Sequence, residues 1–116
     1  MLVSEFGTNA EPAVPLLIAA LTNSDDRVVG VVASALGRIQ RQPDVCVPAL
    51  IPLLDSPNPI TRQRSMMALG PFGGAATSAV PAMIRCLADS HLSARRLATN
   101  SLKQIDPEAA AKAGVK

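Results

Sequence analysis

The sequence predicts an all-α fold: a right-handed α-solenoid of about three antiparallel helix pairs, with partial units at both ends. Three observations lead to this prediction. One phrase recurs every 33 residues, the apolar residues inside each copy follow a helical period, and only two of the 116 residues are aromatic. With 48% hydrophobic residues but no Trp or Tyr, the core must be aliphatic. Such a composition favours packed helices over aromatic and β-branched strands.

The recurring phrase reads "AVPLLIAAL" at 13–21, "CVPALIPLL" at 46–54 and "AVPAMIRCL" at 79–87. The same shift aligns later positions without a gap, including Leu36, Leu69 and Leu102. Self-similarity at a fixed period of this size is typical of stacked repeats. We therefore expect one domain over 1–116, with a partial unit at 1–9, repeats at about 10–42, 43–75 and 76–106, and a short terminal helix at 107–116.

Each repeat contains two helical patterns. In the first repeat, apolar residues at 14, 17, 18 and 21 lie on one side of a first helix, which we name the A helix. A second set at 28, 32, 35, 36 and 39 predicts a second helix, the B helix. Between the patterns lie "TNSDD", "DSPNP" and "ADSHL", which are rich in residues that cap helix N-termini. Each unit is therefore expected to be an antiparallel helical hairpin.

A proline stands early in every expected A helix, at Pro15, Pro48 and Pro81. If the proline lies in the first turn, its missing N–H costs little. If the helix begins earlier, at Glu11, Asp44 or Thr77, the proline bends it; the sequence leaves both possibilities open. Pro71 and the Gly73-Gly74 pair are expected to end the second B helix early, because proline clashes with the carbonyl four residues before it.

The stretch "VPALIPLLDSPNPITRQRSMMALGPFG" at 47–73 resembles the HEAT repeat, in the short bacterial form also called phycobilisome-lyase HEAT-like, and the likeness covers nearly the whole chain. In that pattern an Arg early in the B helix braces the turn that holds an Asp. Arg62 and Arg95 match the Arg, with Asp55 and Asp89 near the turn; the first unit departs, with Val29 and Thr22 at these positions. Ankyrin repeats share the period but their "TPLHxA" pattern is absent, and the aromatic and glycine positions of tetratricopeptide repeats are missing.

Catalytic constellations are missing from the sequence. It has one His and two isolated cysteines, and it lacks GxSxG, HExxH and a Gly-rich phosphate loop, so we expect no enzyme, no metal and no cofactor. Cys46 and Cys86 align with small apolar residues and are expected to be buried thiols, and His91 a turn residue. The acidic residues lie at expected helix ends, where they act as caps and dipole partners: Glu11, Asp25, Asp26, Asp44, Asp55, Asp89, Asp106 and Glu108.

Basic residues gather on the B helices, and Arg85 alone lies in an A helix. In solenoids of this kind the B helices line the concave face that is presented to partners. The side opposite the expected core supplies the candidate partner-binding residues Arg38, Arg41, Gln63, Met67, Arg96, Asn100 and Lys103. Met67 is expected to point outward between basic neighbours, and Gly37 and Gly70 to let a partner approach the helix backbone closely.

These features predict a non-catalytic scaffold that binds a protein or peptide, in particular an acidic or amphipathic one. Two alternatives are a nucleic-acid-binding module and an enzyme, since HEAT-like arrays include bilin lyases and alkylpurine DNA glycosylases. A net charge of +2 is too small to argue for nucleic acid, and the chain lacks the aromatic residues and the acid on the B face that the glycosylase chemistry needs.

Residues 1–7 match only the end of a B helix, through Val3 and Phe6. We therefore expect an apolar surface near 14–21 that is covered by a second copy of the chain, as a homodimer, or by further repeats. At the other end Glu108 and Lys112 form an i,i+4 pair suited to a polar cap. No apolar run approaches the length of a membrane span and no signal peptide is evident, so a cytoplasmic location is expected.

Overall fold

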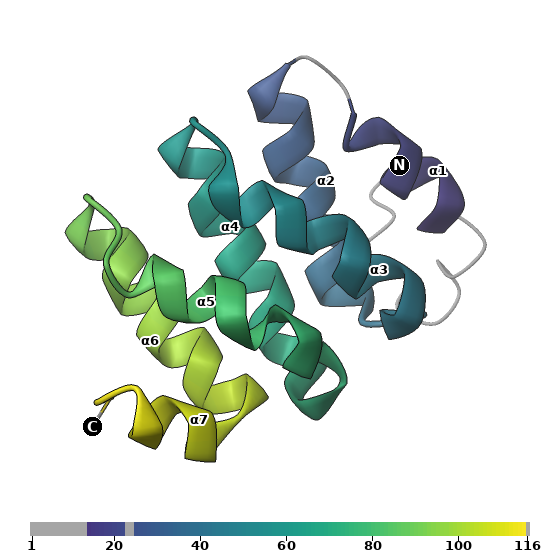
Figure 1. Ribbon diagram of the computed structural model, residues 1–116. Coiled ribbons are helices and arrows are strands. Elements are labelled where there is room, and N and C mark those ends of the chain that lie inside the picture. Colours follow the sequence, from purple (N-terminus) through teal and green to yellow (C-terminus); the bar gives the residue numbers. More distant parts are fainter. Residues whose placement is uncertain (1–13, 23–24, 116) are drawn as a thin grey trace.

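The computed structural model describes residues 14–22 and 25–115, and every regular element in that part is helical. The A helices are α1 (Val14–Ala20), α3 (Pro43–Leu50) with the 3-10 helix η2 (Ile51–Asp55), and α5 (Val80–Cys86). The B helices are α2 (Asp26–Ile39), α4 (Pro59–Leu69) and α6 (Leu92–Ile105). The 3-10 segment η3 (Gly70–Ala79) joins α4 to α5, and α7 (Pro107–Lys112) follows α6. Figure 1 shows α2, α4 and α6 side by side, with the A helices as a second layer in front. The predicted all-α solenoid is confirmed.

One aliphatic seam runs between the two layers. The equivalent residues Leu36, Leu69 and Leu102 of the three repeats are each fully buried. The predicted core residue Val28 is an exception, because it is 36% exposed while its neighbour Val29 is buried. The buried side of α2 runs through Val29, Ala33 and Leu36, one helical position away from Val28. Because Val28 was expected in the core, the outer face expected for the B helices is rotated by a fraction of a turn from the observed outer face.

The shared proline plays different roles in successive repeats. α3 begins at Pro43, so Pro48 lies inside the helix, which tightens into η2 after Leu50. α5 begins at Val80, so Pro81 lies in its first turn, where the missing N–H costs little. α4 ends at Leu69, before Pro71, and Gly73 adopts a positive φ of 57° that breaks the following segment, as expected. The start of the first A helix lies outside the described residues.

One stretch, Pro59–Cys86, is long and apolar enough by composition to cross a membrane. It is not one straight helix, because the backbone leaves helical geometry at Gly73 and Ala76. Its pieces are α4, η3 and α5, which form the middle of the two layers (Figure 1). The core helices of a stacked repeat can have the same length and apolar composition, so this stretch is weak evidence for a membrane span.

Small residues set the distance between neighbouring B helices. Gly37 of α2 lies against Ala68 of α4, so closely that a Cβ on Gly37 would stand 2.7 Å from the Cα of Ala68. One repeat later Gly70 lies against Ser101 and Gln104, and the Ser101 hydroxyl donates a 2.6 Å hydrogen bond to the carbonyl of Met66. The expectation that Gly37 and Gly70 leave the backbone open to a partner is therefore wrong. Both glycines are buried, and the group that approaches them closely is the next B helix.

Replacing Gly37 with Ala tests this packing. Alanine favours the helix by about 1 kcal/mol, but its methyl group would collide with the backbone of Ala68, and overpacking of this kind costs about 1–3 kcal/mol. We expect Gly37→Ala to lower the free energy of unfolding, measured by urea denaturation. Gly30→Ala is the matched control in the same helix, because its new Cβ would meet the flexible stem of Arg64 at an ordinary 3.5 Å. Gly30→Ala should leave stability equal or raise it by up to about 1 kcal/mol; a Gly37→Ala protein as stable as this control would contradict the packing.

Candidate partner-binding surface

Capped turns fix where the B helices begin. The Asp25 carboxylate accepts a hydrogen bond from the Arg27 amide at the start of α2, and Asn58 accepts two at the start of α4. α6 begins after His91, whose amide donates to Asp89 at 3.0 Å. Asp106 caps α7. The expected capping role of the acidic residues is thus confirmed for Asp25 and Asp106, whereas Glu11 lies outside the described residues.

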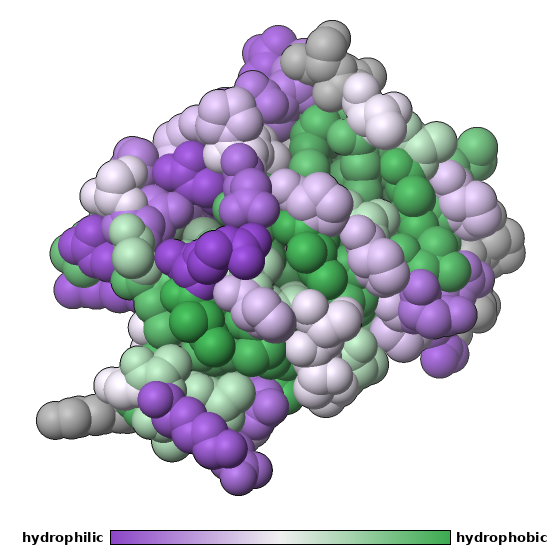
Figure 2. All heavy atoms as spheres, viewed as in Figure 1, coloured by the Kyte–Doolittle hydropathy of each residue, from purple (hydrophilic) through white to green (hydrophobic). Residues whose placement is uncertain are grey.

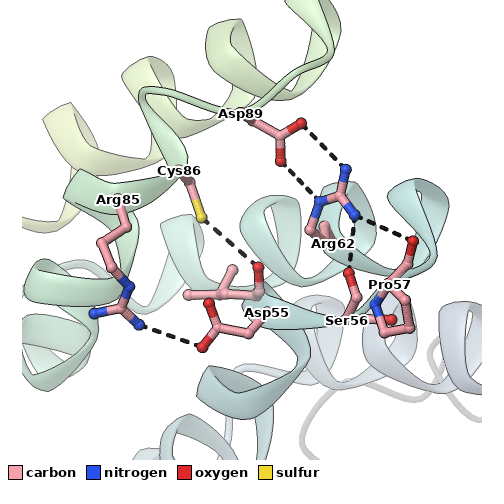
Figure 3. A pocket seen from close by; sticks show the side chains of 8 residues that line it. Asp55, Ser56, Pro57, Arg62, Arg85, Cys86 and Asp89 are labelled. Atoms are coloured by element: carbon pink, nitrogen blue, oxygen red, sulfur yellow. Dashed lines mark hydrogen bonds and ion pairs between the residues drawn. The ribbon is translucent and has the colours of Figure 1, made fainter.

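Arg62 joins two successive turns (Figure 3). Its Nη1 donates to the carbonyls of Ser56 and Pro57, which braces the turn before its own helix. Its Nε and Nη2 donate to the carboxylate of Asp89 in the next repeat, at 2.8 and 3.2 Å. Arg95 braces the following turn in the same way, through a 2.7 Å hydrogen bond to the Asp89 carbonyl.

The bracing role that the HEAT resemblance implies for Arg62 and Arg95 is confirmed, with one difference. The Asp that Arg62 pairs with belongs to the next repeat, whereas Asp55 forms an exposed pair with Arg85 at 3.3 Å. In the first repeat the buried Val29 occupies the Arg position, so this position has no guanidinium group to brace the turn.

The pair of Arg62 and Asp89 is largely withdrawn from water, with side chains 15% and 6% exposed. The hydrogen bond from Arg62 outweighs the opposing effect of burial and lowers the pKa of Asp89 from 3.8 to about 2. Beside the pair, burial raises the pKa of the Cys86 thiol to about 11, which disfavours the reactive thiolate. Cys46 and Cys86 are both buried, as expected. The polar groups around this pocket bond one another, so its arrangement is that of a structural clamp (Figure 3).

The clamp predicts a loss of stability in acid. Because the folded-state pKa of Asp89 lies below its ordinary value, its contribution is fully present above about pH 4 and disappears as the pH falls through about 2. We expect the free energy of unfolding to fall by on the order of 1–2 kcal/mol over this interval through Asp89. Asp89→Asn should lower stability at pH 7 and flatten this part of the profile, measured by urea unfolding at several pH values. An unchanged acid profile in Asp89→Asn would contradict the clamp.

A groove runs along the outer side of α2 and α4. Two adjoining pockets of about 190 and 260 Å³ form it, and both include Arg64. Its hydrophobic residues are unusually open to solvent: Val31 is 69% exposed, Ile60 55% and Met67 52%. We name it the α2–α4 groove; its lining residues are Asp26, Arg27, Gly30, Val31, Ser34, Gly37, Arg38, Gln40, Ile60, Arg64, Met67, Ala68 and Pro71.

Six of the seven candidate residues from the sequence lie on the three B helices, and Arg41 follows α2. The structure brings Arg38 and Met67 together in the groove. Arg41 is exposed just after α2, and Gln63 is half-buried on α4. Arg96, Asn100 and Lys103 are exposed on α6. Arg96 and Lys103 occupy the positions that are Gly30 and Gly37 in α2, and Gly37 faces the next repeat.

Sequence reasoning missed Val31, Ile60 and Arg64 as groove residues. Ile60, Arg64 and Met67 follow i, i+4, i+7 spacing, which places them on one side of α4. The spacing of these residues could therefore have indicated the groove. Because Val28 was expected in the core, the partner-binding face of the B helices was expected closer to the following repeat.

Positive charge lines the groove at Arg38 and Arg64. Arg38 and Arg64 form no ion pair with any residue that the structure describes, whereas Arg27 pairs with Asp25 at 3.3 Å. Within residues 14–22 and 25–115, no three His, Cys, Asp or Glu side chains gather as metal ligands. The surface thus offers exposed apolar residues beside two guanidinium groups that form no ion pair with the described residues, which suits binding.

The comparisons with known proteins agree with this architecture. A family model described as HEAT repeats matches residues 47–113, more than half of the chain. The molecule is an α-solenoid repeat protein, and the chain belongs to the HEAT-repeat family. A crystal structure of an engineered protein, a target of the Northeast Structural Genomics Consortium, superposes with a TM-score of 0.71 and 23% identity. The alignment covers 97% of this chain and 59% of the engineered one, and at this identity it shows the fold alone. A search of the curated proteins gave no match.

Proposed function

We propose that this HEAT-repeat chain is a non-catalytic scaffold that binds a protein or peptide partner in the α2–α4 groove. The observation that supports this most directly is the exposure of three hydrophobic side chains, Val31, Ile60 and Met67, in one groove between two packed helices. Clustered exposed apolar residues of this kind are typical of interaction sites. HEAT arrays commonly serve as protein-interaction scaffolds, which agrees with this use of the surface.

The chemistry of the groove favours an acidic amphipathic segment as the partner. Arg38 and Arg64 line the groove beside its apolar residues and have no internal ion pair among the described residues, so a partner's carboxylates would meet them without displacing an existing one. Met67 adapts its shape to different side chains. The length of α2 is about 21 Å, enough to hold roughly four turns of a helical peptide.

Nucleic acid is the weaker alternative, because the exposed apolar residues beside the arginines do not match a phosphate backbone. An enzyme of the bilin lyase or glycosylase type is weaker still, since the clustered polar groups near Arg62 bond one another. In this proposal the protein acts in the cytoplasm. The expected homodimer through the N-terminal end involves a different part of the surface and is compatible with partner binding.

The groove is tested with a fluorescent 15-residue amphipathic peptide that carries Leu on one face and Glu beside it. We expect Met67→Glu and Arg64→Glu each to weaken binding at least about tenfold, measured by anisotropy, because each removes a central contact or charge. Ile84→Glu and Arg85→Glu are matched controls on α5, where both residues are exposed but lie outside the groove.

Controls that weaken binding as much as the groove variants would contradict the proposed site. A labelled single-stranded DNA that binds more tightly than the peptide, and is released steeply by salt, would favour the alternative. A double Arg96→Glu, Lys103→Glu variant shows whether the binding surface extends onto α6.

A further inference from the structure

Met67 is the one exposed sulfur-containing residue in the part of the chain that the structure describes. The sequence has two cysteines and four methionines, and Met1 lies outside the described residues. Met67 is 52% exposed, whereas its neighbour Met66 and Met83 of α5 are fully buried. Figure 2 shows hydrophobic residues at the surface over α1 and α2 as well, but neither helix contains a methionine. A reagent that attacks thioethers from solvent therefore reaches Met67 before the other described methionines.

The two cysteines compete poorly with Met67 for an oxidant. Cysteine reacts with peroxides through its thiolate, and its susceptibility follows thiolate character and exposure. Cys46 and Cys86 are both buried, and burial raises the pKa of both thiols, that of Cys86 to about 11. The Cys46 thiol also donates a 3.1 Å hydrogen bond to the carbonyl of Arg41. Little thiolate is therefore present at neutral pH, whereas the thioether of Met67 needs no deprotonation to react.

Met67 lies in the α2–α4 groove beside two guanidinium groups. Arg38 of α2 and Arg64, three residues before Met67 on α4, line the same pocket. Neither arginine forms an ion pair with a residue that the structure describes. A thioether here is apolar and flexible, whereas a sulfoxide is polar and its oxygen accepts hydrogen bonds from guanidinium N–H groups. Oxidation would therefore remove apolar contact area from the groove and occupy donors that a partner's carboxylates need.

We propose that Met67 is a modification site for peroxides, and that its conversion to methionine sulfoxide weakens partner binding in the α2–α4 groove; the second half rests on the proposed function. The Met67 sulfur attacks one oxygen of hydrogen peroxide, so an S–O bond forms as the O–O bond breaks. The sulfur is oxidised, and the departing hydroxide takes the proton of the transferred oxygen and leaves as water. Reduction by a methionine sulfoxide reductase reverses the change, so the groove has two interconvertible states.

The site is tested by treating the full chain with hydrogen peroxide and mapping the sulfoxides by tandem mass spectrometry, which separates the adjacent Met66 and Met67. We expect sulfoxide to form at Met67 at least about tenfold faster than at Met66 or Met83, because oxidation follows exposure. Circular dichroism of the treated chain should be unchanged, since the core methionines remain thioethers. Oxidation of Met66, Met83 or either cysteine at the rate of Met67 would overturn the assignment of the site.

The effect on binding is tested with the amphipathic peptide described above, synthesised without Met or Cys. Once the peroxide is removed, we expect the treated chain to bind this peptide at least about tenfold more weakly, and reductase treatment to restore the affinity. Met67→Leu is the matched control, because it lacks this thioether but keeps the other methionines and both cysteines. Its affinity should be the same before and after peroxide. Comparing the two values for each protein cancels any effect of the substitution itself.

The failure of this inference and the failure of the proposed function give different results. A chain that does not bind the peptide before treatment would overturn the proposed function, and the effect of oxidation with it. A chain that binds before treatment, and binds equally well once Met67 is oxidised, would overturn the inference alone. An equal loss of binding in peroxide-treated Met67→Leu would place the sensitive residue elsewhere and would also overturn it.

Discussion

The contact between a glycine on one B helix and a small residue on the next holds the rest of this structure in place. Gly37 admits Ala68 and Gly70 admits Ser101, so α2, α4 and α6 approach closely enough to share one aliphatic seam with the A helices. A chain of this size buries enough apolar surface for stability only when its layers pack at close distance. In the two repeats that another B helix follows, this position is Gly37 and Gly70, and the equivalent residue of α6 is the exposed Lys103.

The clamp at Arg62 fixes how two neighbouring repeats are aligned. Close packing of small residues alone permits neighbouring helices to slide, whereas a guanidinium bonded to two carbonyls and one carboxylate fixes the register of two turns. Removing one partner would leave the other charge with little access to water, which is costly. The same turns fix where α4 and α6 begin, and therefore which side of α4 presents Ile60, Arg64 and Met67 to the outside.

The sequence alone predicted the helices and their stacking, because the same apolar pattern occurs three times at a period of 33 residues. It was insufficient for the outer surface. Whether a residue such as Val28 faces the core or the previous repeat depends on a rotation smaller than one helical position, and periodicity in short helices does not resolve it. Gly37 and Gly70 were assigned to the wrong neighbour for the same reason. The partner of Arg62 also escaped prediction, since the sequence offers both Asp55 and Asp89 and three-dimensional register decides between them.

Ends and middles of a repeat array have different requirements, and the same position changes chemistry accordingly. The contacts between neighbouring B helices join Gly37 to Ala68 and Gly70 to Ser101, whereas α6 carries the exposed Arg96 and Lys103. The most direct test of the central contact is a proton nuclear Overhauser measurement between the α-protons of Gly37 and the methyl group of Ala68. The packing of the B helices predicts a strong cross-peak, since these groups lie in van der Waals contact. Its absence, with the Gly37 α-protons instead showing exchange cross-peaks to water, would contradict the account.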